Sequence, residues 1–217
     1  MLILLPPSEG KAEPETGEPV ALNSLAFAAE LAEKRRELLE AFDPRLAAAP
    51  AAPAAEVYTG VLFNRLELPK LSAAARRRVL IASALWGMLR PDDCIPYYKF
   101  PPKTRLEGIG APAAYWRPAL AEALPDEEGE LIVDMRSAAY SSFWKPKRAT
   151  LLAVRAFTEE NGERKAVSHM AKAVRGDVAR ALLEAKKAPA DPEGAAAIAE
   201  GAGFRVELTP GSLDVIV

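Results

Sequence analysis

Near its start the chain carries a hydroxyl, a carboxylate and an amine within four residues, in the stretch LLPPSEGK. The residues concerned are Ser8, Glu9, Gly10 and Lys11. Such a loop can bind an anion through backbone N–H groups and one ammonium. It is not a phosphate loop of the Walker type, because Leu5 occupies the position of the first glycine and Ala12 that of the serine or threonine. A solvated turn is the alternative interpretation, and both stay open.

The stretch DMRSAAY, residues 134–140, places a carboxylate, a guanidinium and a phenol after an apolar run. In one interpretation Asp134 and Arg136 form an ion pair that fixes a loop. In the other, Asp134 orients a ligand hydroxyl or ammonium, while Arg136 holds a phosphate or carboxylate by bidentate contact. Ser8, Glu9, Lys11, Asp134, Arg136 and Tyr140 are therefore the candidate catalytic residues.

The segment 134–180 is basic, although the chain as a whole carries a net charge of −2. It contains ten lysines and arginines against five acids, a local balance of +5. A patch of this kind could attract a polyanion. The residues predicted to contact an anion or DNA are Lys11, Arg90, Arg136, Lys145, Lys147, Lys172 and Arg175. A solvated helix face is the alternative for His169, Lys172 and Arg175, which are spaced by three.

The elements that must position these residues alternate between strands and helices. Residues 1–5 are predicted as a strand buried on both faces, because their apolar residues do not alternate with polar ones. A buried strand is also predicted over 79–85, and a strand that ends at Asp134 over 130–134. Strands are also expected over 204–208 and 214–217, and a hairpin over 149–170 with its turn at Asn161 and Gly162. Helices are expected over 24–42, 72–78, 111–124, 171–187 and 191–204, with an Ala/Pro connector over 44–55.

This order predicts an α/β fold, a single compact domain over residues 1–217 with a mixed β-sheet flanked by helices. The polar clusters follow three of the apolar strands: Ser8 to Lys11, Trp86 to Asp93, and Asp134 to Ser137. Because the carboxyl ends of strands in such sheets converge on one crevice, we expect a site there.

The numbers of cysteines and histidines limit the kinds of site that the chain can form. One cysteine, Cys94, and one histidine, His169, exclude an internal disulfide and a structural zinc site of four Cys or His ligands within the chain. Cys94 is a poor peroxide sensor because the neighbouring Asp92 and Asp93 should raise the pKa of its thiol. No apolar segment reaches the roughly 20 residues of a membrane span, so a cytoplasmic protein without a membrane partner is expected. Neither a cofactor nor a metal is predicted, although the composition leaves a metal held by carboxylates open.

The stretch LEGIGAPAAYW, residues 106–116, has the glycine pattern of a helix-hairpin-helix DNA motif. Such a hairpin needs a helix on both sides of the turn. The preceding YYKFPPKTR is too rich in proline for a helix, so a simple turn at the start of a helix is favoured.

Six stretches along nearly the whole chain carry a resemblance when taken in order: LILLPPSEGK, EVYTGVLF, ASALWGMLRPDDCIPYYKF, YW at 115–116, DMRSAAYSSFWKPKR and HMAKAVRGDVARAL. Taken together, they resemble the YaaA family of peroxide stress proteins. The positions that match the family pattern are Tyr58, Gly60, Gly87, Arg90, Pro91, Asp93, Tyr97 or Tyr98, Trp116, Tyr140, Lys145, Lys147, Lys172, Arg175 and Gly176. Glu9 departs from the Ser-Pro-Ala-Lys of the family's best-described branch.

The resemblance implies a cytoplasmic α/β domain with a positively charged cleft, double-stranded DNA as a partner, and a role in limiting iron-linked oxidative damage. It brings no settled reaction, so whether the chain is an enzyme stays open. The alternative hypothesis is an enzyme acting on a small anionic or nucleotide-like ligand. Its crevice would be formed by Ser8, Glu9, Lys11, Arg90, Asp134, Arg136, Tyr140 and Lys172. A monomer is compatible with both hypotheses.

Overall fold

The computed structural model describes residues 1–160, 163–166 and 170–217. Its centre is a mixed sheet of the order β4-β3-β1-β6-β7-β10-β9, with β8 paired to β7. The inner strands β3, β1, β6, β7 and β10 are parallel to their neighbours in this order. Their bounds are Val79–Ser83, Leu2–Leu5, Leu131–Asp134, Thr150–Glu160 and Ser212–Ile216. The predicted α/β class and mixed sheet are confirmed.

The central strands form because their apolar side chains are covered on both faces of the sheet. Every residue of β3 and β6 is buried, and so are the last three residues of β1. The register places Leu4 beside Leu80 on one side and beside Asp134 on the other. The ends of β1 and β6 are therefore neighbours, and the loops that follow these two strands leave the same edge of the sheet.

Antiparallel strands complete the sheet. Strand β4 (Gly87–Leu89) pairs with β3, and β9 (Arg205–Thr209) pairs with β10. Strand β8 (Glu163–Ala166) pairs with β7, which confirms the predicted hairpin, while its turn at Asn161 and Gly162 lies outside the described residues. A separate two-stranded sheet joins β2 (Ala51–Pro53) to β5 (Cys94–Pro96).

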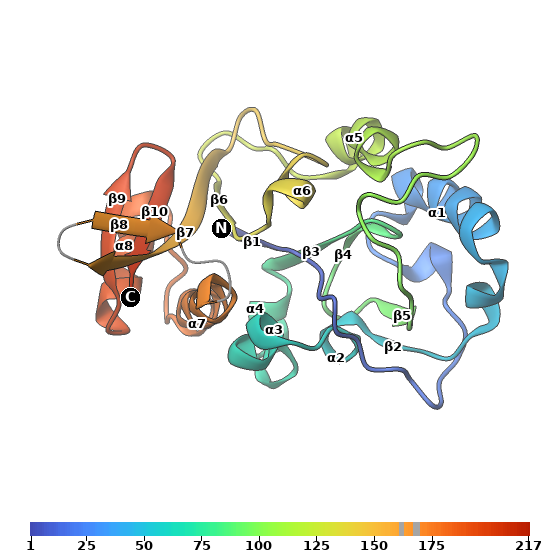
Figure 1. Cartoon of the computed structure of the whole chain (residues 1–217), viewed down its shortest axis with the longest axis horizontal. Helices are drawn as coiled ribbons and strands as arrows, with labels where there is room; N and C mark the ends of the chain where they lie inside the picture. Colours follow the sequence, from blue (N-terminus) through green and yellow to red (C-terminus); the bar gives the residue numbers. More distant parts are fainter. Residues whose placement is uncertain (161–162, 167–169) are drawn as a thin grey trace.

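Helices lie on both sides of the central strands. In Figure 1, α3 (Val61–Leu66), α4 (Ala73–Arg76) and α7 (Met170–Glu184) lie below β1 and β3, while α5 (Pro112–Ala123) and α6 (Ala138–Ser141) lie above them. Helix α1 (Ala28–Phe42) lies on the right, α2 (Ala54–Val57) lies near the bottom between α3 and β2, and α8 (Pro192–Gly201) lies on the left, next to β9. Short 3₁₀ turns cover Leu22–Ser24, Pro44–Ala48 and Leu68–Lys70.

Some predicted boundaries are wrong. Helix α1 begins at Ala28 because Phe27 takes a left-handed φ of 59°, which interrupts the expected continuation from Ser24. The strand expected over 79–85 ends at Ser83, and the chain reverses into β4, which the sequence did not predict. The connector 44–55 contains a 3₁₀ turn, β2 and the start of α2, and α7 ends three residues before the expected Lys187.

A buried arginine fixes the reversal between β3 and β4. Arg35 on α1 is 0% exposed and donates hydrogen bonds to the carbonyl oxygens of Trp86 (3.1 Å), Met88 (2.8 Å) and Ala26 (2.9 Å). Burial lowers the pKa of its guanidinium to about 10, partly offset by the charge of Asp93. Carbonyl acceptors compensate the loss of hydration, so Arg35 ties α1 to the loop that follows β3.

The packing of α7 on α3 requires a glycine. A Cβ at Gly176 would lie 2.5 Å from the carbonyl oxygen of Leu62 and 2.8 Å from Cβ of Arg65. The two helices therefore approach more closely than any side chain at position 176 would allow, and this contact holds α7 on the layer that contains α3.

We expect Gly176→Ala to lower the free energy of unfolding by about 1–3 kcal/mol, because the added methyl group must push the two helices apart. Gly201→Ala is the matched control, since a Cβ at Gly201 meets nothing within 4 Å. Urea denaturation of both variants checks the expectation. A Gly176→Ala variant as stable as the control would mean that α3 and α7 do not pack this closely.

Candidate functional site

The loops after β1, β3 and β6 meet at the carboxyl edge of the parallel strands. Strand β1 lies between β3 and β6, so the chain first passes to one side of β1 and later crosses to the other. In open α/β sheets a crevice forms where the strand order reverses in this way. Ser8 to Lys11 follow β1, and Met135 to Tyr140 follow β6. The predicted convergence of these two loops is confirmed.

Lys11 is the central polar group of this edge. It is half-buried, and its Nζ donates a hydrogen bond to the carbonyl oxygen of Ser8 (2.7 Å). The same nitrogen lies 4.6 Å from the ring centroid of Tyr98 and 5.7 Å from that of Tyr58. Burial lowers the pKa of Lys11 to about 8, and the charge of Glu9 partly opposes the shift. Within the described part of the chain, no carboxylate forms an ion pair with it.

Three hydroxyl groups form a buried chain beside the amine. The Tyr98 hydroxyl lies 2.6 Å from that of Tyr58 and 2.7 Å from that of Ser83. The Ser83 oxygen also accepts the backbone N–H of Trp86 (3.0 Å). Burial raises the pKa of both phenols well above the ordinary value. These groups are therefore protonated at neutral pH and can pass a proton along the chain from one oxygen to the next.

The small sheet of β2 and β5 brings the two tyrosines together. Tyr58 follows β2 and α2, whereas Tyr98 lies two residues beyond β5. Backbone contacts join the segment that holds Tyr58 to the lysine loop, since Ala12 N–H donates to Val57 (2.8 Å) and Thr59 N–H donates to Gly10 (3.1 Å). Lys11 and Tyr58 form a β-bridge between these segments.

The Ser8 hydroxyl has a positioning role. It donates to the carbonyl oxygen of Thr59 and so fastens the loop after β1 to the segment that carries Tyr58. Gly60 follows with a φ of 104°, and a Cβ there would lie 2.8 Å from the Ser8 hydroxyl oxygen. Only glycine combines this backbone conformation with so close an approach.

Tyr140 and Glu9 lie at the same edge. Tyr140 is half-buried, and its hydroxyl makes no hydrogen bond to any residue that the structure describes. Burial raises the pKa of this phenol, with further contributions from Tyr98 and Glu9. Glu9 is exposed, and its charge acts on Lys11 and Tyr140 alike. The edge therefore combines the amine of Lys11 with a carboxylate and a phenol hydroxyl, neither of which makes a hydrogen bond to a described residue.

Asp134 and Arg136 form a buried ion pair, as the first of the two interpretations predicts. Arg136 Nε and Nη2 lie 2.9 and 2.8 Å from the two carboxylate oxygens of Asp134. The guanidinium also donates to the carbonyl oxygens of Trp144 (2.9 Å) and Tyr140 (3.4 Å). With both side chains buried and committed to internal partners, the pair holds the loop that carries Tyr140 onto the end of β6.

Two further predicted residues of α7 face different surroundings. Arg175 donates to the carbonyl oxygen of Val154 on β7 (3.1 Å); burial lowers its pKa and the charge of Asp134 partly opposes that shift. Lys172 is exposed one turn earlier in the helix. Because Val154 follows the residue that pairs with Asp134, this end of α7 lies at the carboxyl edge.

Arg90 does not join the cluster around Lys11. Its guanidinium donates to the carbonyl oxygen of Arg77 (2.6 Å), which lies just before β3, at the amino end of that strand. Arg90 instead lines an open cleft of about 670 Å³ together with Phe27, Arg148 and the residues 121–127. The predicted grouping of Arg90 with Lys11 is wrong because β4 reverses the chain direction, while its role in anion binding stays a prediction.

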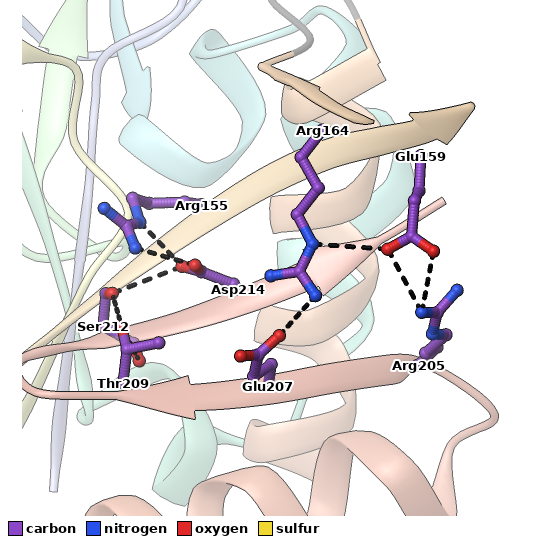
Figure 2. Close-up of polar contacts among 8 residues, drawn as sticks. All are labelled: Arg155, Glu159, Arg164, Arg205, Glu207, Thr209, Ser212 and Asp214. Carbon is purple, nitrogen blue, oxygen red and sulfur yellow. Dashed lines mark hydrogen bonds and ion pairs between the residues drawn. The ribbon is translucent and has the colours of Figure 1, made fainter. Parts of the chain in front are cut away.

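Ion pairs neutralise much of the basic segment. Figure 2 shows Arg155 paired with Asp214, and Arg164 paired with both Glu159 and Glu207. In the same way Arg180 pairs with Glu67 and Glu184. The exposed cations without an ion pair to any described residue include Lys145, Lys147, Arg148 and Lys172.

These exposed cations do not form one patch. Asp126 accepts the backbone N–H groups of Lys147 (2.7 Å) and Arg148 (2.8 Å), just before the start of β7. Lys147 and Arg148 therefore lie toward the amino ends of the parallel strands, whereas Lys172 lies toward the carboxyl ends. His169, which the sequence groups with Lys172, lies outside the described residues.

Sequence reasoning did not include Tyr58, Tyr98 or Ser83 among the candidate catalytic residues. Ser83 could have been found, because it ends an apolar strand as Asp134 does. Tyr58 and Tyr98 matched the family pattern, but no spacing in the sequence shows that their hydroxyls meet. The contact depends on the pairing of β2 with β5, strands of three residues each.

The structure also bears on two other predictions from the sequence, the turn before residue 111 and the weak reactivity of Cys94. Residues 106–110 form a tight turn before α5, with φ values of 76° at Gly108 and 82° at Gly110 and no helix over 99–111. The simple helix-entry turn is confirmed. The pKa of the Cys94 thiol is raised by partial burial and by the charges of Asp93, Glu56 and Asp92, as expected for a poor thiolate.

The described residues contain neither a candidate metal-binding cluster nor a helix that could span a membrane. No cluster of three or more His, Cys, Asp or Glu side chains there could hold a metal ion. No helix among residues 1–160 and 170–217 combines the length and the apolar character needed to cross a membrane.

Comparison with known proteins identifies the family. A family model described as "Peroxide stress protein YaaA" matches residues 18–207. A UPF0246 protein of Streptomyces coelicolor is 40% identical, over 100% of this chain and 98% of the relative. A UPF0246 protein of Corynebacterium efficiens is 34% identical over the same shares, and one of Corynebacterium glutamicum is 32% identical over 97% and 96%. The chain therefore belongs to the YaaA family of peroxide stress proteins.

Proposed function

We propose that this peroxide stress protein is an enzyme acting on a small anionic, nucleotide-like ligand at the carboxyl edge of its sheet. The observation that carries the proposal is the environment of Lys11. Its amine is half-buried and lies over two tyrosine rings, without an ion pair to any described carboxylate. A partly desolvated cation without a counterion is costly in a fold and is typical of ligand sites.

The surrounding groups suit such a ligand. The Lys11 ammonium would hold a phosphate or carboxylate, assisted by Lys172 and by the exposed backbone around Gly10. Tyr140 offers a hydroxyl that has no hydrogen-bond partner among the described residues, and a ring that could stack on a base. The carboxylate of Glu9 would accept a hydrogen bond from a hydroxyl or amino group of the ligand. The mixture of charges favours one bound molecule over a featureless polyanion surface.

Lys11→Met should abolish binding of small anions, whereas Lys147→Met, which removes an exposed cation, should leave it unchanged. Because only the ammonium form binds an anion, affinity should fall as pH rises through about 8, the pKa of Lys11. The protonated fraction drops about tenfold between pH 7 and pH 9 for such a group. Calorimetric titration with nucleotides, pyrophosphate and phosphate across this pH range measures both effects.

The proposal fails if none of these anions binds the wild-type protein. It also fails if the affinity is the same for Lys11→Met, or if it falls only near the ordinary lysine pKa of about 10.4.

Binding of double-stranded DNA is the second candidate function. It is favoured by the exposed side chains of Lys145, Lys147, Arg148 and Lys172, none of which has an ion pair within the described residues. Phosphate contacts by such side chains give binding without sequence preference. A protein bound in this way would limit iron-linked oxidative damage by covering the duplex. The separation of Lys147 from Lys172 implies that DNA would have to wrap around one end of the molecule.

Replacing Lys145, Lys147 and Lys172 together by Gln should weaken duplex binding and flatten its salt dependence. Each lost phosphate contact lowers the slope of log K against log salt by about 0.9. The charge-matched control replaces the exposed Lys103, Lys186 and Lys187 by Gln. Fluorescence anisotropy measures the binding, and plasmid nicking by ferrous iron and peroxide measures protection. Equal affinities for the two triple variants would exclude this surface as the DNA contact.

A further inference from the structure

The chemistry available to Lys11 goes beyond holding an anion. One N–H bond of its amine is used by the carbonyl oxygen of Ser8, and no other hydrogen bond to a described residue is present. Two positions on the nitrogen therefore remain for a ligand or solvent. The loop itself is fixed by the Ser8 hydroxyl, the bridge between Lys11 and Tyr58, and the contact of Gly60 with Ser8. The amine is thus held in place rather than free at the end of a mobile side chain.

Proton donors lie at the same edge as this amine. Tyr58, Tyr98 and Ser83 form a connected chain of hydroxyls, and Lys11 Nζ lies over the rings of both tyrosines. The hydroxyl of Tyr140, which makes no hydrogen bond to a described residue, lies at the same edge. A positioned amine next to weak acids is the arrangement that addition to a carbonyl group requires, because the carbonyl oxygen must gain a proton as the C–N bond forms. An ion-paired lysine would lack this capacity, because the carboxylate stabilises the ammonium form and so keeps the proton on the nitrogen.

We propose that Lys11 is a nucleophile that forms an imine with an anionic aldehyde or ketone bound at the carboxyl edge. This inference rests on the proposed function, because it names the ligand class of the same site. The exposed backbone of the loop and Lys172 would hold the anionic group of the ligand, while Lys11 reacts with its carbonyl carbon.

The step balances without an oxidant or a second substrate. The unprotonated amine adds to the carbonyl carbon, and the C–O double bond opens as its oxygen takes a proton from the phenol of Tyr140. The nitrogen of the adduct then returns one proton to the phenolate, which restores Tyr140 and leaves a neutral carbinolamine. Its hydroxyl group leaves as water after taking a proton from Tyr140, and the remaining proton on the nitrogen passes back to the phenolate. The products are the imine and one water molecule, and Tyr140 ends protonated.

The pKa of Lys11 supports this step. At a pKa of about 8, roughly a quarter of the amine is unprotonated at pH 7.5, against about 0.1% for a lysine at the ordinary value of 10.4. The phenols, whose pKa values are raised by burial, keep their protons over the same range. An attacking base and a proton donor thus coexist near neutral pH.

Reductive trapping tests the inference. The full chain is incubated with pyridoxal 5′-phosphate as a probe anionic aldehyde, together with cyanoborohydride, and each labelled lysine is quantified by peptide mass spectrometry. At pH 7.5 we expect Lys11 to be labelled at least about tenfold faster than the exposed Lys147, with a rate that levels off above pH 8 to 9. Tyr140→Phe should slow the labelling of Lys11 and leave that of Lys147 unchanged.

Lys11→Arg keeps the positive charge but cannot form the imine, so it separates capture from anion binding. The inference is overturned if Lys11 is labelled no faster than Lys147, or if its labelling does not depend on the reductant. When Lys11→Arg still binds nucleotides and wild-type Lys11 is not labelled, the imine is refuted and the proposed function survives. If neither anion binding nor labelling of Lys11 is observed, both the imine and the proposed function are refuted.

Discussion

The candidate site depends on one constraint: the amine of Lys11 is removed from much of its water and forms no ion pair with a carboxylate of the described residues. Lys11 receives one carbonyl oxygen and two aromatic faces in place of hydration. Cation–π contacts of this kind contribute about 0.5–2 kcal/mol, less than the cost of burying an unpaired charge. The deficit is visible in the lowered pKa of Lys11. A fold tolerates such a group when the rest of the structure determines its position.

The central sheet determines the position of Lys11. β1 and β6 are neighbours, so the loops that carry Lys11 and Tyr140 must leave the same edge. Each loop is then fixed by buried polar contacts: Ser8 to Thr59 on one side, and Arg136 to Asp134 and Trp144 on the other. Breaking a buried ion pair leaves an uncompensated charge and costs about 3–5 kcal/mol. Asp134 and Arg136, which resemble part of a ligand site in the sequence, therefore stabilise the loop that carries Tyr140.

The parts of this site that follow from the sequence are those set by local patterns. Unbroken apolar runs predict β1, β3 and β6, and the rule for strand ends then places Lys11 and Tyr140 together. The sequence neither predicts that Tyr58 meets Tyr98 nor places Arg90 correctly, because these positions depend on pairing between distant segments. The pairing of β2 with β5 joins the tyrosines, and the reversal at Gly87 carries Arg90 to the opposite edge. Ion pairs between residues far apart in the sequence, such as Arg155 with Asp214, also neutralise part of the local charge of +5 that a count over residues 134–180 gives.

The titration of Lys11 itself is the most direct test of the account. With lysines carrying ¹³C at the ε position, the signal of Lys11, assigned through its loss in Lys11→Met, is followed by NMR between pH 6 and pH 12. The account requires a midpoint near 8, well below the ordinary lysine value of about 10.4. A midpoint at that ordinary value would contradict it, because Lys11 would then be a solvated surface lysine with no special chemistry.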